Sequence, residues 1–421
     1  MTVTDNGAGI NPVAATAQGR DPRLSGPPRT PAEAVRAVRR RVRAGELGPW
    51  PVIFGLIVIA VVFQSLTDSF LSPGNLTNLA MQIAAGGTIA VGIVFVLLLG
   101  EIDLSAGSVS GAAGALMAVL TVSHGWPAWL GILAALVMGA LIGAFQGTIF
   151  AKIGVPSFVV TLGGLMGWLG LQLLILGPQG TINIPYDGFV AKLTNTFLPR
   201  VAGWVVTVGI VVVYFVFALL DLRRRSAAGL PGRGMVSLLI RTIGLGLLAG
   251  SVTAVLNQGR GVPLALVILV TIVVVFDLIL RRTRYGRSIF AVGGNIEAAR
   301  RAGLPVDRIR ISVFALCSTL AAFGGILFAS RGYSVGQSSG GSDTLLLAIA
   351  AAVIGGTSLF GGRGSTYSAL LGILVLQSIQ SGMLLVQIDT PIRYMVTAAV
   401  LVGAVILDSL SRRGRRSSGR E

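Results

Sequence analysis

The sequence has very few residues of the kinds that carry metal or nucleophilic chemistry. Its 421 residues include one cysteine, Cys317, and one histidine, His124. A single cysteine forms no internal disulfide, and a metal site rich in cysteine is excluded with it. Cys317 lies in an apolar run and His124 in a short loop. We interpret them as a packed core residue and an incidental loop residue, which disfavours a zinc enzyme and a cysteine hydrolase.

Charged residues are scarce too, at 12% of the chain, whereas a soluble domain carries about 25%. Hydrophobic residues make up 53%, and the 58 glycines suit close helix packing in lipid. A chain of this composition belongs in a bilayer. Its apolar runs are continuous and about twenty residues long, which favours membrane helices over the alternating segments of a β-barrel.

The formal net charge of +17 raises the question of nucleic-acid binding. The positive residues argue against it, because they cluster beside the apolar runs in stretches such as "DLRRRSAAGLPGRG" and "SRRGRRSSGR". This placement is typical of the cytoplasmic loops of membrane proteins. We therefore expect a lipid environment and no nucleic-acid partner.

The apolar runs predict about twelve transmembrane helices, and the fold class is all-α and polytopic. They are residues 51–66, 79–99, 104–122, 128–149, 155–176, 200–220, 235–256, 262–280, 310–330, 344–360, 365–387 and 392–409. With a cytoplasmic N-terminus, the arginines after the sixth, eighth and twelfth runs all fall on the cytoplasmic side. One miscounted run would break this agreement but a miscounted pair would not, so ten helices stay possible. Both termini are expected in the cytoplasm.

The regions outside the apolar part are polar and basic. Residues 1–49 predict a cytoplasmic tail that is mostly disordered or holds an interfacial helix starting near Thr30 on anionic lipid. Residues 50–409 form the expected transmembrane domain, and residues 410–421 a second basic tail.

Two breaks in the apolar pattern resemble each other: "GEIDLSAGS" at 100–108 and "GGTSLFGGRGS" at 355–365. Each joins two apolar runs through Gly, Ser and a charge, on the expected cytoplasmic side. Asp103 or Ser105 is expected to cap the next helix, and Glu101 to lie at the membrane interface. A sharper hypothesis is that Glu101 or Asp103 contacts the arginine-rich loop 281–309. The residues assigned to this hinge are Glu101, Asp103, Ser105, Gly107, Ser108, Gly355, Gly356, Thr357 and Gly364.

The loop 281–309 is too long for a simple turn and predicts one or two short amphipathic helices. Asn295 can cap a helix that Gly303 ends. The loop is either a connector on the lipid surface or a docking element for a cytoplasmic partner. The chain has no phosphate-binding GxxxxGK[ST] motif, so it cannot itself hydrolyse ATP as a motor.

Four motifs carry a family resemblance: "VGIVFVLLLGEIDLSAGS" (91–108), "VPSFVVTLGGL" (155–165), "GRSIFAVGGNIEAARRAGL" (286–304) and "AIAAAVIGGTSLFGGRGS" (348–365). The chain resembles the permease subunits of bacterial ABC importers for monosaccharides, in the ribose, xylose and galactose branch. The stretch 200–260 looks like the two-helix insertion of xylose-type permeases. Small departures from the family pattern stand at Ala106, Arg301 and Phe360.

The resemblance implies a transport subunit rather than an enzyme, in the bacterial cytoplasmic membrane. It implies a second permease copy, cytoplasmic ATPase subunits that bind ATP and Mg, and an extracytoplasmic sugar-binding protein; it implies no cofactor on this chain. It also makes loop 281–309 the element that couples to the ATPase. The residues expected there are Gly293, Gly294, Asn295, Glu297, Ala298, Ala299 and Arg300.

The sugar path is expected to be a sparse seam of small polar side chains. The candidates are Asn78, Gln82, Thr88, Thr161, Gln172 and Gln377, together with Ser108 and Thr357 of the hinge. Each is also explained as an interhelical hydrogen bond. D-Xylose is the first choice of substrate, with arabinose, galactose, glucose and ribose as alternatives. An ion-coupled secondary transporter is the rival class, disfavoured because Asp277 and Asp343 lie near segment ends rather than at mid-membrane.

Overall fold

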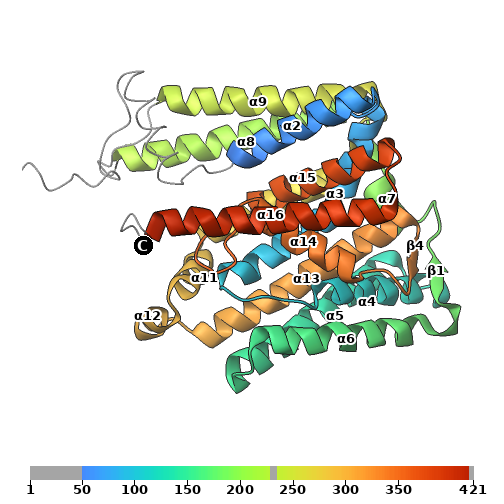
Figure 1. Ribbon diagram of the computed structural model, residues 1–421, viewed down its shortest axis with the longest axis vertical. Coiled ribbons are helices and arrows are strands. Elements are labelled where there is room, and N and C mark those ends of the chain that lie inside the picture. Colours follow the sequence, from blue (N-terminus) through green and yellow to red (C-terminus); the bar gives the residue numbers. More distant parts are fainter. Residues whose placement is uncertain (1–49, 228–234, 417–421) are drawn as a thin grey trace, which may run out of the picture.

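The computed structural model describes residues 50–227 and 235–416. Its long helices lie side by side along one direction (Figure 1). The apolar helices are α2 (Trp50–Leu66), α3 (Pro73–Leu98), α4 (Ala106–Ala118), α5 (Ala128–Thr148), α6 (Ser157–Leu176), α8 (Arg200–Ala227), α9 (Met235–Gln258), α10 (Leu264–Arg282), α13 (Val306–Gly332), α14 (Ser342–Ile354), α15 (Thr366–Leu385) and α16 (Thr390–Arg416). Each predicted apolar run corresponds to one of them, in order.

Among the described residues, nine helices are long and apolar enough to cross a membrane. Three shorter apolar helices accompany them: α2, α14 and the part of α16 up to Gly403. The predicted class, an all-α polytopic membrane protein, is confirmed. The helix expected near Thr30 lies outside the described residues. The last helix, α16, continues to Arg416, into the stretch expected to be a basic tail.

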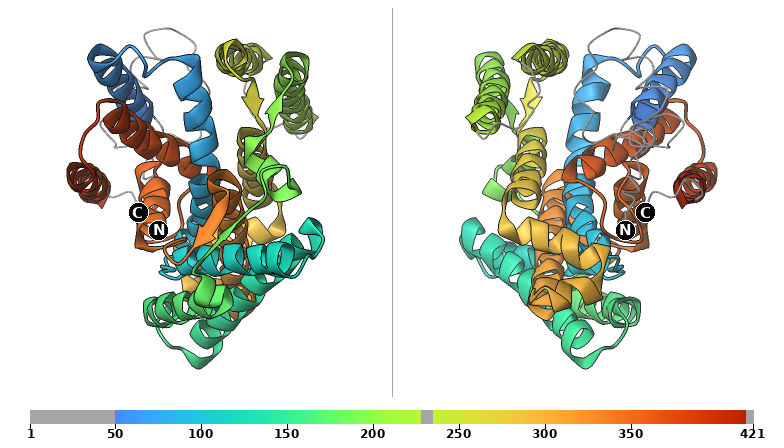
Figure 2. Two further views of the ribbon diagram at one scale, coloured as in Figure 1. Left: turned by 90° about the vertical axis from the view of Figure 1, so that its right-hand side faces the viewer. Right: turned by 90° about the vertical axis from the view of Figure 1, so that its left-hand side faces the viewer.

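Helix α3 is the centre of the bundle. In its most apolar window 94% of the residues are buried, compared with 6% in α8 and in α9. Helix α3 is surrounded because it packs against α13, α15, α10 and α14. Figure 2 shows α2 and α16 on one side of α3 and the α8–α9 pair on the other. The α8–α9 pair therefore leaves most of its apolar surface uncovered by this chain.

Helices α5 and α13 pack through a row of glycines. Gly139, Gly143 and Gly147 recur every fourth residue, which places them on one face of α5. A Cβ atom added at Gly139 would lie 2.7 Å from the Ser318 carbonyl oxygen, and one at Gly143 would collide with the Phe314 carbonyl oxygen. Small residues at such spacing let two helix backbones approach closely in lipid. This contact holds α5 to the core, whereas α6 packs mainly on α4.

The two ends of the bundle differ. At one end, which we call the strand end, β1 (Thr181–Asn183) pairs with β4 (Ser334–Gly336) and β2 (Phe197–Leu198) with β3 (Val262–Pro263), both antiparallel. The 3-10 turn η4 (Gly177–Gln179) precedes β1, α7 (Phe189–Asn195) precedes β2, and the π-type turn η2 (Val119–Ser123) extends α4 at this end. A second π-type turn, η3 (Ile149–Ile153), extends α5 at the opposite end, where Phe150 contacts Arg310.

The other end, which we call the arginine end, contains α11 (Arg284–Gly294) and α12 (Ile296–Arg301). Figure 1 shows these two short helices at the same end of the molecule as the C-terminal ends of α8 and α16, opposite the strands. Arg223 and Arg224 of α8 lie at this end with Arg281 and Arg282 of α10. The two short amphipathic helices predicted in loop 281–309 are confirmed.

The α5–α13 contact predicts which glycines tolerate a side chain. Gly143→Leu should destabilise the protein by about 1–3 kcal/mol, because the new side chain must push the α13 backbone away. Gly163→Leu on α6 is the matched control, since a Cβ there meets nothing within 4 Å. Thermal unfolding of the detergent-solubilised protein, followed by tryptophan fluorescence, measures both. Equal unfolding temperatures for the two variants would contradict the close packing.

Candidate functional site

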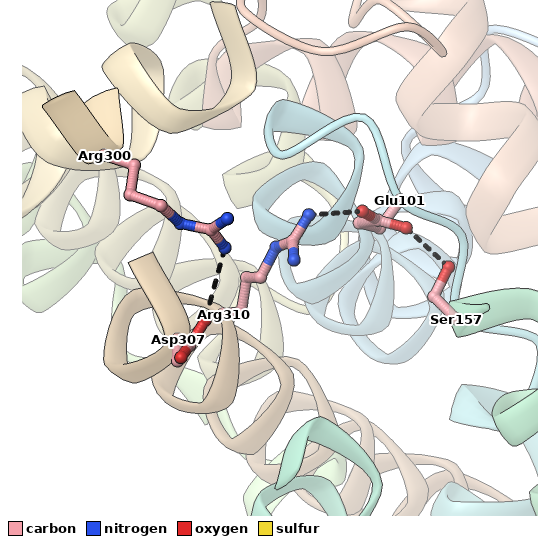
Figure 3. Close-up of polar contacts among 5 residues, drawn as sticks. All are labelled: Glu101, Ser157, Arg300, Asp307 and Arg310. Carbon is pink, nitrogen blue, oxygen red and sulfur yellow. Dashed lines mark hydrogen bonds and ion pairs between the residues drawn. The ribbon is translucent and has the colours of Figure 1, made fainter. Parts of the chain in front are cut away.

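The break between α3 and α4 places Glu101 in an ion pair at the arginine end. Gly100 turns the chain with a φ of +79°, a conformation that glycine adopts readily. Glu101 Oε1 then lies 3.5 Å from Arg310 Nη2 on α13, and the Ser157 hydroxyl on α6 donates to Oε2 at 2.7 Å (Figure 3). One carboxylate therefore ties the α3–α4 connection to two further helices.

The Glu101–Arg310 pair is largely shielded from water, since the two side chains are 17% and 14% exposed. Burial raises the pKa of Glu101, while the Ser157 hydrogen bond and the Arg310 charge oppose the rise. The Arg310 guanidinium also lies 4.5 Å above the Phe150 ring. A shielded pair of this kind couples its helices more strongly than an exposed one.

Of the two acids expected to contact the arginine-rich loop 281–309, Glu101 does so one residue beyond the stated end of the loop. Its partner Arg310 follows that loop, in the second turn of α13. Arg300 of α12 instead lies 3.9 Å from Asp307, and both side chains are more than half exposed (Figure 3). The sequence did not single out Ser157 or Arg310. The sequence feature that could have indicated Arg310 is its position as an arginine at the very start of an apolar run.

Asp103 is fully buried and organises the start of α4. Its Oδ1 accepts the backbone N–H of Ser105 at 2.8 Å and the Ser105 hydroxyl at 2.7 Å. Burial raises the pKa of Asp103, and the bonds from Ser105 oppose the rise. Ser105 stands at the N-cap position but makes no side-chain bond to the helix, so the predicted capping role does not hold for Ser105. Asp103 contacts no residue of α11 or α12 through a hydrogen bond or ion pair that the described residues make.

The remaining hinge residues of the first break hold close packing. A Cβ atom at Gly107 would lie 2.9 Å from the Gly340 carbonyl oxygen. The Ser108 hydroxyl is buried and donates to the Ser105 carbonyl at 2.9 Å. Ser108, also a candidate for the sugar path, is therefore engaged by its own helix.

The second break, 355–365, lies directly against the first. The Gly362 N–H donates to the Leu98 carbonyl at 2.9 Å, and a Cβ atom at Gly100 would lie 3.3 Å from the Phe360 carbonyl oxygen. Inside this break, Gly356 has a φ of +103°. The structure thus brings the two similar breaks together.

Three more residues of the second break are packed against neighbours or buried. Gly355 packs on the Ser368 backbone, and Gly364 on the Thr357 side chain. Thr357 Oγ1 is buried without a hydrogen-bond partner among the described residues.

Helices α11 and α12 dock on these breaks. A Cβ atom at Gly293 would collide with the Leu98 carbonyl oxygen, whereas at Gly294 it would meet nothing within 4 Å. Asn295 caps α12 as predicted, accepting the Ala298 N–H at 2.9 Å. Of the predicted contact face, Glu297, Ala298 and Arg300 are exposed. Ala299 is not, because it is buried in the core that holds α12.

Two of the predicted path residues lie together. Gln82 of α3 and Gln377 of α15 line one cavity of about 450 Å³ near the strand end. This cavity is also lined by Arg331, Asp343 and Tyr394, which the sequence did not single out as path residues because each stands near a helix end.

The other four path candidates make hydrogen bonds inside the chain. Asn78 Oδ1 accepts from Arg260 at 2.6 Å, and Thr88 donates to the Ala84 carbonyl at 2.8 Å. Thr161 donates to the Ser157 carbonyl at 3.0 Å, and Gln172 Nε2 to the Gly336 and Ser339 carbonyls at 2.9 Å. These contacts give Asn78, Thr88 and Thr161 a structural role, whereas Gln172 Oε1 is buried without a hydrogen-bond partner among the described residues.

The family model described as "Branched-chain amino acid transport system / permease component" matches residues 75–405. The xylose transport system permease protein of Escherichia coli K12 is 36% identical over 363 residues, which are 86% of this chain and 92% of the relative. Its Haemophilus influenzae counterpart is 32% identical over 375 residues, covering 89% and 99%. The ribose import permease protein of Bacillus subtilis is 30% identical over 363 residues, covering 86% and 92%. None of the solved structures matches the chain.

The shielded ion pair predicts a measurable coupling energy. A double-mutant cycle of Glu101→Gln and Arg310→Gln should give a coupling of about 1–2 kcal/mol in the free energy of unfolding, because either single change leaves the other group unpaired and buried.

The matched control is the exposed pair, Arg300→Gln with Asp307→Asn, for which we expect less than about 0.5 kcal/mol. Thermal unfolding in detergent gives both values. A coupling at Glu101 no larger than at Asp307 would contradict the structural role assigned to the shielded pair.

Proposed function

The chain belongs to the family of permease components of the branched-chain amino acid transport type, and we propose that it is the membrane-spanning subunit of an ATP-driven monosaccharide importer. The observation that carries the proposal is the 36% identity that spans 92% of a xylose transport permease. The chain is an integral membrane transport subunit of the bacterial cytoplasmic membrane and not itself an enzyme. No group of three or more metal-ligating side chains occurs among the described residues.

D-Xylose is the proposed substrate. Two relatives named as xylose permeases are 36% and 32% identical to the chain, and relatives named as ribose permeases are 30% identical. The helices α8 and α9 support the same branch, because they form the two-helix stretch that the sequence resemblance links to xylose-type permeases. Arabinose, galactose, glucose and ribose differ from xylose by few groups and are the substrates to test beside it.

We place the ATPase partner at the arginine end, which faces the cytoplasm by the positive-inside rule. Helices α11 and α12 offer an exposed surface there that includes Glu297 and Arg300. Their inner face is fixed to both breaks through Gly293 and Leu98. A push on α11 and α12 is therefore passed to the ends of the membrane helices rather than absorbed by a loose loop.

The sugar-binding protein docks at the strand end in this proposal, on the extracytoplasmic side. A second permease copy completes the membrane part. Uncovered apolar side chains on α2, α5, α6, α8 and α9 provide ample surface for lipid and for that copy. The ATP and Mg that drive transport are bound by the partner ATPase.

Reconstitution tests the proposed function. Proteoliposomes that contain the permease, its ATPase and the sugar-binding protein should accumulate labelled xylose only when ATP reaches the ATPase, and proton or sodium ionophores should not reduce uptake. Unlabelled arabinose, galactose, glucose and ribose, added in turn as competitors, rank the substrates. Uptake by the permease alone, driven by an ion gradient, would show a secondary transporter instead.

The docking proposal predicts the effect of a charge reversal. Glu297→Arg should abolish sugar-stimulated ATP hydrolysis and weaken co-purification of the ATPase at least tenfold, because it places a positive charge on the docking surface while leaving the buried side of α12 intact. Asp187→Arg at the strand end is the control with the same change of charge, and it should keep the ATPase bound. Unchanged coupling in Glu297→Arg would refute the assignment of this surface.

A further inference from the structure

The cavity that holds Gln82 and Gln377 has a buried floor and an exposed mouth. Helices α3, α13, α14, α15 and α16 enclose it. Gln377 is 8% exposed, whereas Asp343 and Tyr394 near the mouth are exposed. The volume of about 450 Å³ lies within the range of pockets that bind small molecules. A molecule the size of one sugar fits it with room to reorient.

The floor presents polar groups without partners. The side chains of Gln82, Gln377 and Gln380 all line the cavity, and none of them makes a hydrogen bond to another residue that the structure describes. Gln377 is buried, and Gln82 and Gln380 are half-buried. Amides shielded from water are nearly always paired in native proteins. Three such amides around one cavity therefore indicate a site that supplies both donors and acceptors to something inside it.

The mouth adds charged groups held in fixed positions. Tyr394 donates to Asp343 Oδ2 at 2.8 Å, which leaves Oδ1 free to accept. Arg393 Nη2 donates to Thr390 Oγ1 at 2.6 Å. Arg331, at the last turn of α13, lines the same cavity and makes no ion pair with an acid among the described residues. One carboxylate and two guanidinium groups thus surround the entrance.

Apolar surface completes the lining. Phe328 of α13 and Leu347 of α14 belong to the cavity wall. A monosaccharide has hydroxyl groups around its rim, each both a donor and an acceptor, and C–H groups across its faces. Amides match the first property and an aromatic ring the second. A small inorganic ion would not use the amides as both donors and acceptors, and it would make no use of the apolar wall.

We propose that this cavity is the transit site for the neutral monosaccharide, in which Gln82, Gln377 and Gln380 bind its hydroxyl groups and Asp343 accepts one more at the mouth. The inference rests on the proposed function for the identity of the sugar. It adds to that function a defined place on the chain where the sugar is held after the binding protein releases it and before it crosses.

Uptake by the reconstituted complex tests the proposal. Gln377→Leu combined with Gln380→Leu should lower maximal xylose uptake at least fivefold, while ATP hydrolysis stimulated by the loaded binding protein stays within twofold of wild type. A merely structural role would lower both rates together. The control Gln258→Leu changes an exposed glutamine on α9 and should leave both rates unchanged. Normal uptake per ATP in the double variant would overturn the site.

A labelling experiment tests the same cavity without transport. Cys317 is the only cysteine and is fully buried, so Gln380→Cys in the full chain offers one accessible thiol. Free xylose alone should slow its reaction with a membrane-impermeant thiol reagent at least threefold, and should not slow the reaction of Gln258→Cys. Absence of protection would overturn the site, and protection by glucuronate instead of xylose would overturn the neutral ligand.

The two experiments separate the site from the function on which it rests. Protection by xylose in a complex that takes up no monosaccharide would refute the proposed importer and support the cavity as a sugar site. The opposite result is xylose uptake by the wild type, no protection of Gln380→Cys by xylose and no loss of uptake in the double variant. It would support the proposed importer and refute the cavity as a sugar site.

Discussion

The carbonyl oxygen of Leu98 is the point on which the arginine end depends. Leu98 ends α3, and the last carbonyls of a helix have no partner within it. The Gly362 N–H from the second break donates to this oxygen at 2.9 Å, and Gly293 of α11 packs so close to it that no Cβ fits. Three segments far apart in the sequence thus meet backbone to backbone. Gly293 must be glycine because a side chain there would push α11 away from Leu98, and Gly362 has a φ of +71°, which glycine adopts readily.

Two acids at the arginine end have polar partners, whereas three amides around the cavity near the strand end have none among the described residues. At the arginine end, Glu101 is paired with both Arg310 and Ser157, and Asp103 is bonded to Ser105. At the strand end, the cavity amides lack partners among the described residues. Paired groups fix a geometry, whereas unpaired groups around a cavity are available to a ligand. The pairing of Glu101 fits the proposed coupling role of the arginine end, and the free amides fit the proposed sugar site.

The sequence predicted the helices well because apolar runs of about twenty residues and flanking arginines are local signals. The same holds for the Asn295 cap and for the helix that Gly303 ends. The Glu101–Arg310 pair joins residues 209 positions apart, so no local sequence pattern predicts it.

Four of the six path candidates hydrogen-bond to other parts of the chain instead, which the sequence did not predict for a related reason. Thr88, for example, bonds the carbonyl four residues earlier. A polar residue in an apolar run gives the same sequence pattern whether it hydrogen-bonds to its own helix or faces a cavity. Only the packed structure shows that Gln377 lines the cavity and Thr88 does not.

Three helices connect the two ends. Helix α3 carries Gln82 near one end and Leu98 at the other, α13 carries Arg310 and Arg331, and α15 runs from the second break to Gln377 and Gln380. A helix of twenty residues is about 30 Å long and moves as a rigid body. Any displacement of α11 that shifts Leu98 and the second break must therefore move the cavity walls as well, since the same helices form both. Docking of a partner on α11 and α12 would therefore change the shape of the cavity through the movement of these shared helices. No chain of side-chain contacts between the two ends is needed.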